Sequence, residues 1–416
     1  MSKILKKCIS LLGGDDLGRH FLILTAVHVL LMLGIGLSSV FTSVFLFKMN
    51  NSDYALTAKY TAYMFAFEMI TFIICLYFYK YFSIAKTMQA GLWIYSFSYI
   101  VLLLLRNNLI DYYILVAGLV ALGAGFYWFG YNLLLKNYTT SENRQKALSF
   151  NGTCCYIVSI IASPISGYVT SSFDGMTGYI IIFTITIIAY AIGARLMREL
   201  PDDGVYEPRF RKVSTYILKT KSIFLIYLSD FFRGLHIGMT YYYTPILLYS
   251  LTSDEFILGI ALMLKQLSAI ITWRCIRNLK TLRQRLLWTV IPYGVELLVL
   301  TVMMTTTKSG FMVYAVFLYC SFYNLTDILG SNFAQMPIFE STQLLRKNCG
   351  ADREFMPFKQ ILLNTGRSLG IVIMLMLPTD AKYQILALAV TTAIAIFGTF
   401  ICNAGAKQMA LEVENE

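Results

Sequence analysis

RELPDDGVYEPRFRKVSTYILKT, residues 198–220, is the longest polar stretch in the middle of this chain. Six long apolar stretches precede it and six follow it. A helix needs about 20 apolar residues to cross a hydrocarbon core of about 30 Å, and each stretch supplies roughly that length. The sequence therefore predicts an all-α integral membrane protein with transmembrane helices at 21–47, 57–80, 86–105, 110–136, 146–171, 177–197, 221–249, 256–276, 284–305, 310–340, 357–378 and 382–404.

The composition excludes a soluble globular protein. The chain is 57% hydrophobic and 14% charged, whereas soluble domains carry about 25% charged residues. A net charge of +11 would suit nucleic acid, but the basic residues lie in short loops and do not form one amphipathic face. We therefore expect no nucleic-acid partner and place the protein in the cell membrane as a multi-pass protein.

The basic residues are distributed unequally between the two sides. The N-terminal tail, the even-numbered loops and the C-terminal tail hold 26 of the 34 lysines and arginines, and the opposite loops hold five. Cytoplasmic loops carry such an excess of positive charge, so both termini are predicted to be cytoplasmic. The apolar run after Arg19 is too long for a signal peptide and lacks a cleavage site, so we expect the first helix to be retained.

The two halves of the chain resemble each other at an offset of about 200 residues, which is typical of an internal repeat. Gly36 corresponds to Gly238, and Arg144 corresponds to Arg353. Two short segments correspond as well, namely Ser52-Asp53 with Ser253-Asp254 and Gly130-Tyr131-Asn132 with Gly330-Ser331-Asn332. We predict an N-terminal six-helix bundle (1–197), a cytoplasmic linker (198–220) and a C-terminal six-helix bundle (221–416).

These features resemble the major facilitator superfamily (MFS) of bacterial-type transporters, without indicating a subfamily. The resemblance covers six plus six helices, cytoplasmic termini, a basic central loop and an R-x-x-A element from Arg144 to Ala147. The superfamily signature between the second and third helices is reduced here to the segment from Lys80 to Lys86. The resemblance implies two bundles related by a pseudo-two-fold axis, with helices 1, 4, 7 and 10 around a central cavity.

Charged side chains in the bilayer are costly, so each needs a partner, a watery cavity or a function. Lys265 and Glu296 stand at nearly equal depth on consecutive helices, and we expect them to form a structural ion pair. Asp230, Arg233, Asp327 and Arg367 are expected to form a cluster in the second bundle. That cluster either locks the helices together or is broken by a substrate or a proton during transport.

Glu68 has no basic residue near its depth in the first half of the chain. Desolvation favours the neutral form of such a carboxyl, which can then take up and release a proton. The alternative is a structural role as a protonated group that hydrogen-bonds within the bundle, for example to His28. The predicted proton-coupling residues are Glu68, Asp230 and Asp327.

Polar and aromatic stripes indicate which side chains face the cavity. The clearest stripe places four polar residues at spacings of three and four along 310–340, and a second one runs along 110–136. The predicted substrate-binding residues are Trp128, Tyr131, Asn132, Arg233, Tyr241, Asn324, Ser331, Gln335 and Arg367. A cavity of this kind suits an amphipathic solute better than a small sugar.

We predict a secondary active transporter that exports an organic, amphipathic solute by proton antiport and alternating access. A proton-coupled importer and a flippase for a lipid or a lipid-linked sugar remain as alternatives. A membrane-embedded enzyme is not favoured, because the sequence has no H-E-x-x-H motif and no long extramembrane loop. The expected partners are a small organic substrate, protons and membrane lipids. A monomer is expected, with no metal and no cofactor.

Overall fold

The protein is all-helical in the part of the chain that the computed structural model describes, which is residues 14, 16–49, 54–140, 142–173, 176–202, 204–276, 279, 281–307, 310–378 and 380–414. The segment Ser52-Asp53 lies outside these ranges. Each of the twelve predicted apolar stretches overlaps one long helix. These helices are α2 (Arg19–Met49), α3 (Tyr54–Phe78), α4 (Ile84–Leu105), α5 (Tyr113–Asn137), α6 (Arg144–Ser172), α7 (Thr177–Leu196), α9 (Lys221–Thr252), α10 (Glu255–Ile276), α11 (Leu282–Thr306), α12 (Met312–Cys349), α13 (Phe355–Met376) and α14 (Ala381–Glu414).

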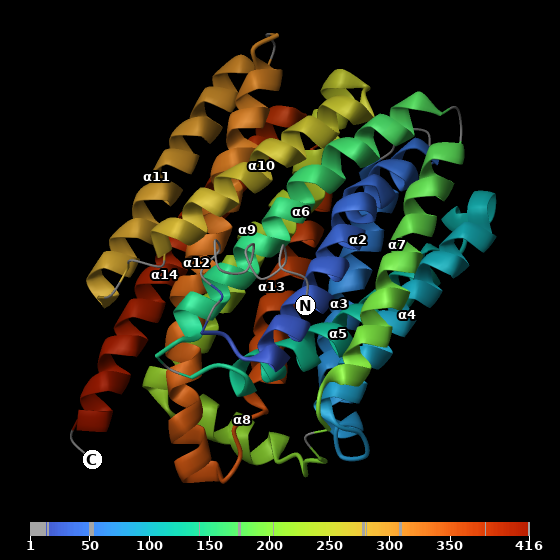
Figure 1. Cartoon of the computed structure of the whole chain (residues 1–416). Coiled ribbons are helices and arrows are strands. Elements are labelled where there is room, and N and C mark those ends of the chain that lie inside the picture. The colour runs from blue at the N-terminus through green and yellow to red at the C-terminus, as the bar shows by residue number, and fades with distance from the viewer. Residues whose placement is uncertain are drawn as a thin grey trace.

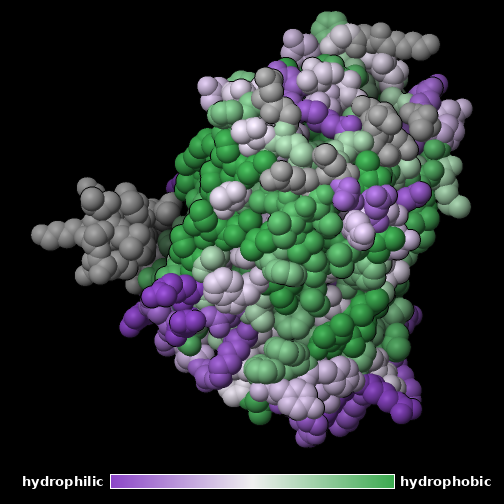
Figure 2. All heavy atoms as spheres, turned by 90° about the vertical axis from the view of Figure 1, so that its right-hand side faces the viewer, coloured by the Kyte–Doolittle hydropathy of each residue, from purple (hydrophilic) through white to green (hydrophobic). Residues whose placement is uncertain are grey.

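Ten helices in the described ranges are long and apolar enough to cross a membrane. The other two long helices, α9 and α13, have the length but are less apolar, because α9 carries Asp230 and Arg233 and α13 carries Lys359 and Arg367. Figure 2 shows a broad band of hydrophobic side chains on one face of the molecule, with hydrophilic side chains above and below it. The protein is a multi-pass membrane protein, as the sequence predicts.

The helices pack as two groups. The first group is α2–α7, in which α2 packs on α6 and α7, and the second is α9–α14, in which α9 packs on α13 and α14. The groups meet mainly where α6 lies against α10 and where α3 lies against α13. All the long helices run roughly along the same direction (Figure 1).

The linker between the groups contains a short helix that the sequence analysis did not predict, α8 (Phe210–Lys219). Val213 and Ile217 are its buried residues and stand four positions apart, so one face of α8 is apolar and packs on the bundle. Figure 1 shows α8 lying across one end of the bundle, near the end of α14. We call this end the α8 end and the other end the opposite end.

Glycines let α9 and α13 pack in close contact. Gly234 and Gly238 stand four residues apart on α9, and Gly366 and Gly370 do so on α13. A Cβ atom at any of the four would overlap with backbone of the other helix. Small residues at this spacing allow two membrane helices to approach closely. This contact sets the distance between the charged side chains that α9 and α13 carry.

The corresponding glycines of the two halves have corresponding neighbours. A Cβ at Gly36 on α2 would lie 3.1 Å from Ala162 of α6, and one at Gly238 on α9 would overlap with α13. Gly130 on α5 packs on α4, and Gly330 on α12 packs on α11. The contact of α2 with α6 therefore corresponds to that of α9 with α13. The contact of α5 with α4 likewise corresponds to that of α12 with α11.

Candidate functional site

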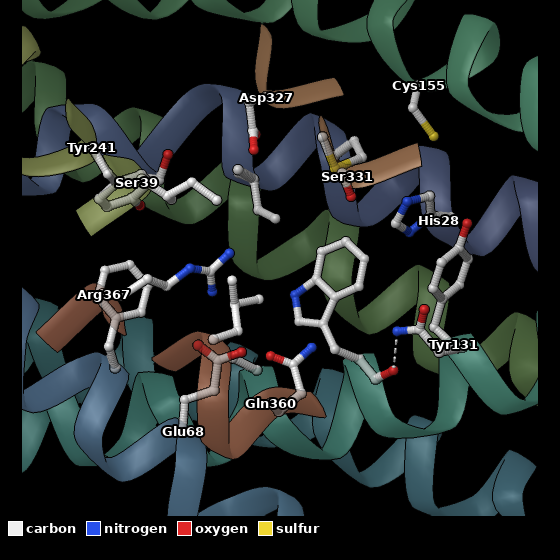
Figure 3. Close-up of a pocket in the computed structure, with 18 of the residues that line it drawn as sticks. His28, Ser39, Glu68, Tyr131, Cys155, Tyr241, Asp327, Ser331, Gln360 and Arg367 are labelled. Carbon is white, nitrogen blue, oxygen red and sulfur yellow. Dashed lines mark hydrogen bonds between the residues drawn. The ribbon is translucent and has the colours of Figure 1, made fainter. Parts of the chain in front are cut away.

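A cavity of about 460 Å³ lies between the two groups of helices. The first group contributes side chains from α2 to α7, and the second contributes side chains from α9, α10, α12 and α13. Figure 3 shows charged and polar residues of both groups directed into it. The predicted site residues that line the cavity are Glu68, Trp128, Tyr131, Asn132, Arg233, Tyr241, Asp327, Ser331, Gln335 and Arg367.

Arg233 joins two carboxylates, only one of which faces the cavity. Its Nε and Nη2 donate to Oδ1 of Asp230 at 3.1 and 2.9 Å, and its Nη1 donates to Oδ1 of Asp327 at 3.1 Å. The Asp230 side chain is fully buried, whereas that of Asp327 is 32% exposed. Asp230 therefore lies behind the cavity wall and holds Arg233 in place. Asp327 is the carboxylate of the cluster that is exposed to the cavity.

Arg367 does not join this cluster, contrary to the sequence-based expectation. Its Nη1 donates to Oδ1 of Asn364 at 3.0 Å, and its guanidinium lies 4.9 Å from the ring centroid of Phe65. Its Nε is buried without a hydrogen-bond partner. Asp327 and Arg367 do stand on helices of the same group, but Asp327 is turned toward Arg233. Arg367 instead faces the first group of helices across the cavity.

Glu68 on α3 is the acidic side chain that faces Arg367. It is buried and lines the cavity, and Arg367 is close enough to act on it electrostatically. Within the described ranges no basic group lies within ion-pair distance of the Glu68 carboxylate. Figure 3 shows Glu68, Gln360 and Arg367 directed into the same part of the cavity. The alternative that Glu68 bonds to His28 is not seen, and His28 Nδ1 instead lies 2.8 Å from the Tyr127 hydroxyl.

Aromatic side chains occupy another part of the cavity. The ring centroids of His28 and Tyr131 are 4.1 Å apart and stacked, and Trp128 packs edge-on against His28 at 5.3 Å. Asn151 donates to the Tyr131 hydroxyl at 2.7 Å, which fixes that ring. In Figure 3, His28 and Tyr131 lie together, well apart from Glu68 and Arg367. The cavity thus has a charged end, where Phe65 also packs on Arg367, and an aromatic end formed by His28, Trp128 and Tyr131.

Two predicted site residues do not line the cavity. Asp230 lies behind it, as described above. Asn324 is buried against α10, where its amide donates to the backbone oxygen of Lys265 at 2.7 Å. The spacing along α12 predicts Asn324 on the same stripe as Asp327. Asn324 lies two turns before Ser331, however, on a part of α12 that packs on α10. Its role is to join two helices.

The predicted ion pair between Lys265 and Glu296 is also wrong. Glu296 is fully buried, accepts a hydrogen bond from the Thr326 hydroxyl at 2.7 Å and lies 3.1 Å from Nε2 of His236. The Lys265 ammonium lies 5.1 Å from the centroid of the Tyr323 ring. The two side chains instead contact different partners, Glu296 those of α9 and α12 and Lys265 the Tyr323 ring of α12.

Sequence reasoning missed Lys359 and Gln360, which line the cavity from the first turns of α13. Lys359 is 7% exposed, and in the described part of the chain it makes neither a hydrogen bond nor an ion pair. The Gln360 side-chain oxygen is buried without a partner. A signal was present, because Lys359, Leu363 and Arg367 stand at spacings of four and so form one stripe.

Side chains connect the two groups at the opposite end of the cavity. Lys48 at the end of α2 lies 2.7 Å from the Glu255 carboxylate at the start of α10. The Tyr179 hydroxyl donates to the same carboxylate at 3.2 Å, and the Tyr242 hydroxyl donates to the backbone oxygen of Tyr54 at 3.1 Å. These contacts hold α2, α3 and α7 against α9 and α10.

A second set of contacts connects the groups at the α8 end. Lys136 lies 2.9 Å from Asp352, and the Arg144 guanidinium lies 5.1 Å from the Phe339 ring. The Arg353 guanidinium lies 4.9 Å from the Tyr79 ring. Arg144 and Arg353, which correspond in the two halves, therefore each reach an aromatic ring of the other half.

The linker is fastened to this set of contacts. The Tyr206 hydroxyl donates to the Glu354 carboxylate at 2.8 Å, and the backbone N–H of Arg209 donates to it at 2.6 Å. Burial, together with the charge of Glu354, raises the pKa of Tyr206, so its hydroxyl stays protonated and available as a donor. Arg353 also lies over the Tyr206 ring at 4.7 Å. Movement of the loop before α13 would therefore pull on the linker.

The chain matches no family model. It is 24% identical over 410 residues to the uncharacterized protein YqgE of Bacillus subtilis strain 168, which covers 96% of this chain and 90% of that protein. It is 25% identical over 193 residues to an uncharacterized protein in the sodM 3' region of Geobacillus stearothermophilus, which covers 46% of this chain and 90% of that protein.

Three solved structures are similar along their whole length. A bacterial homologue of the iron transporter ferroportin, in an outward-facing state, is 13% identical with a TM-score of 0.67 and covers 92% of this chain and 99% of its own. A D-xylose–proton symporter is 11% identical with a TM-score of 0.70, and the match covers 92% of this chain and 96% of the symporter. A proton-dependent oligopeptide transporter is 12% identical with a TM-score of 0.65, and the match covers 94% of this chain and 98% of that transporter. These likenesses show the fold, which is the one that the resemblance seen in the sequence implies.

Proposed function

We propose that this chain, whose fold is that of the major facilitator superfamily, is a proton-coupled secondary active transporter of an organic solute. The observation that carries the proposal is the cavity between the two groups of helices, because it brings Glu68, Arg233, Asp327 and Arg367 together from both halves. Ionisable side chains inside a membrane usually mark a substrate or proton pathway. The proton-dependent transporters among the similar structures favour coupling to protons over coupling to another ion.

Alternating access would arise from rocking of the two bundles, 1–197 and 221–416, about the cavity, with 198–220 as the linker. We place the α8 end in the cytoplasm, since most of the basic residues lie in its loops. The contacts of Glu255 with Lys48 and Tyr179 would break when the cavity opens outward. The contact of Lys136 with Asp352 would break when it opens inward.

Glu68 is the proposed proton-coupling residue, with Asp327 as a second acid that faces the solute. A buried carboxylate without an ion pair exchanges its proton with far less structural change than one held by a salt bridge. Asp327 is already paired with Arg233, and Asp230 is withdrawn from the cavity. The proposal therefore assigns the proton to Glu68 and assigns a structural role to Asp230.

The remaining cavity residues are proposed to bind the solute. Trp128, Tyr131 and Tyr241 offer aromatic surface, and Asn132, Ser331 and Gln335 offer hydrogen-bonding groups. Such a lining suits an amphipathic molecule, as predicted from the sequence. Efflux and uptake would use the same residues and would differ in whether the proton and the solute bind together or exclude each other.

The test is transport in proteoliposomes that contain pyranine, a pH-sensitive dye, with an imposed pH gradient. A solute that is moved by the protein will change the internal pH in wild-type vesicles, and the change will be absent in Glu68→Gln vesicles. Glu340→Gln is the matched control, because Glu340 is an exposed carboxylate on α12 outside the cavity. Equal proton movement in wild type and Glu68→Gln would remove Glu68 from the mechanism. No proton movement with any solute of a broad panel would argue against proton coupling as a whole.

A further inference from the structure

The cavity contains two positive charges that lack an ion-pair partner. Lys359 and Arg367 both project from α13 and line the cavity, and neither is within ion-pair distance of an acidic group in the described part of the chain. Lys359 is more than nine-tenths buried. A buried charge without a partner is costly unless a ligand or a neighbouring charge compensates it. This arrangement points to a negatively charged ligand group.

The charges around the cavity balance only when Glu68 is ionised. Three basic side chains belong to the cavity, namely Arg233, Lys359 and Arg367. Three acids face them, because Glu68 and Asp327 line the cavity and Asp230 lies directly behind Arg233. Protonation of Glu68 leaves one positive charge uncompensated. A solute with one negative charge would restore the balance.

We infer that the transported solute is an organic monoanion, with its carboxylate or phosphodiester group bound by Arg367 and Lys359, and that it moves in the same direction as a proton on Glu68. This inference rests on the proposed transport function. Arg367 can bind a carboxylate or phosphate through two parallel N–H donors, and the Lys359 ammonium adds a point charge. The Gln360 amide lies between them in the sequence and is available as a further donor.

The aromatic end of the cavity indicates the chemistry of the part of the solute that does not carry the negative charge. His28, Trp128 and Tyr131 form a stacked and edge-on group there. In Figure 3, His28 and Tyr131 lie well apart from Arg367 and Glu68, so one molecule must be extended to reach both. Aromatic surfaces favour an apolar or aromatic body. The solute is therefore an amphipathic acid, with the anionic group at α13 and the apolar body at α2 and α5.

The sign of the coupling follows from the position of Glu68 opposite Arg367. Ionised Glu68 and the anionic group of the solute compete for the same positive charge, whereas protonated Glu68 does not compete. Binding of the proton and binding of the anion therefore strengthen each other, and this coupling is reciprocal. A transporter in which both bind together moves them together, which is symport. A cationic solute would show the reverse behaviour, and the outcome would be antiport.

Other groups near Glu68 do not change this assignment. Tyr95 of α4 and Tyr241 of α9 are close enough to interact with it electrostatically, and both are neutral phenols. His28 of α2 is engaged with Tyr127, and α5 offers the neutral Trp128 and Asn132 to the cavity. Arg367 of α13 is thus the cationic group that acts on Glu68, whereas Lys359 lies nearer to the Asp230–Arg233 pair.

The inference is tested by thermal stabilisation of the purified full-length protein with three probes that share one body. These are 3-phenylpropionate, its neutral amide 3-phenylpropionamide and the cationic 3-phenylpropylamine. We expect 3-phenylpropionate alone to stabilise the wild type. Its apparent affinity should rise by up to about tenfold per pH unit as pH falls toward the range in which Glu68 takes up its proton. Stabilisation by the amine in preference to the acid would overturn the inference.

Two variants separate the anion site from the proton site. Arg367→Gln should weaken 3-phenylpropionate binding by about tenfold or more, because the charge-assisted hydrogen bonds are lost. Glu68→Gln should bind the acid but lose the pH dependence. Lys265→Gln is the matched control, since this lysine is half-buried in the same group of helices but lies outside the cavity. Unchanged binding in Arg367→Gln, or unchanged pH dependence in Glu68→Gln, would contradict the assignment.

A lipid with an anionic headgroup is distinguished by a separate measurement. Phosphatidate is supplied in nanodiscs, and the free acid is supplied in detergent at the same pH. Stabilisation by phosphatidate with no effect of any free acid would make the ligand a lipid and overturn the assignment to a free organic acid. If instead protons move with a cationic solute in proteoliposomes, the transport function stands and the anion inference fails. Protons that move with no solute at all would contradict the transport function itself.

Discussion

The guanidinium of Arg233 lies 3.1 Å from the carboxylate of Asp327, across the contact between α9 and α12. The same guanidinium also binds Asp230, whose second oxygen is buried without a partner. Arg233 therefore forms ion pairs with a buried acid and with an acid that faces the cavity. The two acids are not equivalent, because loss of Arg233 would leave Asp230 with an uncompensated charge in a dry environment.

This difference predicts separate effects on stability and on transport. Asp327→Asn should abolish transport while leaving the unfolding temperature close to that of the wild type, since Arg233 keeps its bonds to Asp230. Arg233→Ala should abolish transport and also lower the free energy of unfolding by about 3–5 kcal/mol, the usual cost of stripping a buried charge of its partner. Thermal unfolding in detergent and uptake into proteoliposomes provide the two measurements. A normal rate of transport in both variants would reduce the cluster to a structural role.

The contacts at the two ends of the cavity predict opposite shifts in access. Glu255→Gln removes the ion pair to Lys48 at the opposite end, and Asp352→Asn removes the ion pair to Lys136 at the α8 end. A hydrogen bond to a charged group contributes about 1.5–3 kcal/mol, and a difference of about 1.4 kcal/mol changes an equilibrium tenfold. Each variant should therefore favour the conformation that is open at its own end by about tenfold or more.

The measurement is the rate at which a membrane-impermeant maleimide labels a cysteine placed in the cavity. Ser331→Cys, in a Cys155→Ala background, supplies that cysteine, because both positions line the cavity. Glu255→Gln should speed labelling from the outside, and Asp352→Asn should speed labelling from the cytoplasmic side. If both variants sped labelling from the same side of the membrane, these contacts would not act as gates.

The sequence predicts most of the fold, because membrane helices are specified by long runs of apolar residues. Every predicted stretch overlaps a long helix, and the boundaries differ by a few residues except where α12 and α14 continue well beyond the membrane core. The helix α8 was missed although Phe210, Val213 and Ile217 stand at spacings of three and four and mark one apolar face, because the segment is polar overall and was interpreted only as a linker. Short surface helices depend on tertiary packing more than on composition.

The direction in which a side chain leaves its helix could not be predicted from the sequence. Lys265 and Glu296 were predicted to pair but do not, because each helix is rotated by its own packing. Asn324 shares a stripe with Asp327 but contacts the backbone of α10. Where a stripe coincided with the family resemblance, as for Trp128 and Ser331, the placement in the cavity is confirmed. The rotation of each helix is set by contacts that lie far apart in the sequence.

The buried network around Glu296 predicts a pattern of energetic coupling. Glu296 contacts His236 and Thr326, and it has no contact with Lys265. A double-mutant cycle between His236→Phe and Glu296→Met should give a coupling energy of about 1–3 kcal/mol in thermal unfolding, as residues in one polar network do. The cycle between Lys265→Met and Glu296→Met should give less than about 0.5 kcal/mol, as distant sites do. A larger coupling for the lysine than for the histidine would contradict the observed contacts.

The close contact of α9 with α13 predicts a strong effect of one methyl group. In Gly238→Ala the added Cβ would overlap with the carbonyl oxygen of Arg367, which is backbone and cannot move without shifting α13. Overpacking of this kind costs about 1–3 kcal/mol and occasionally more. It should also displace Arg367, so solute binding should weaken together with stability.

The matched control is Gly294→Ala on α11, where an added Cβ meets no atom within 4 Å. Alanine favours a helix over glycine by about 1 kcal/mol, so this variant should be as stable as the wild type or slightly more stable. Thermal unfolding of both purified variants, with 3-phenylpropionate titrated into each, separates packing from intrinsic helix propensity. Similar unfolding temperatures for the two variants would mean that α9 and α13 can separate without cost. The position of Arg367 would then no longer depend on their contact.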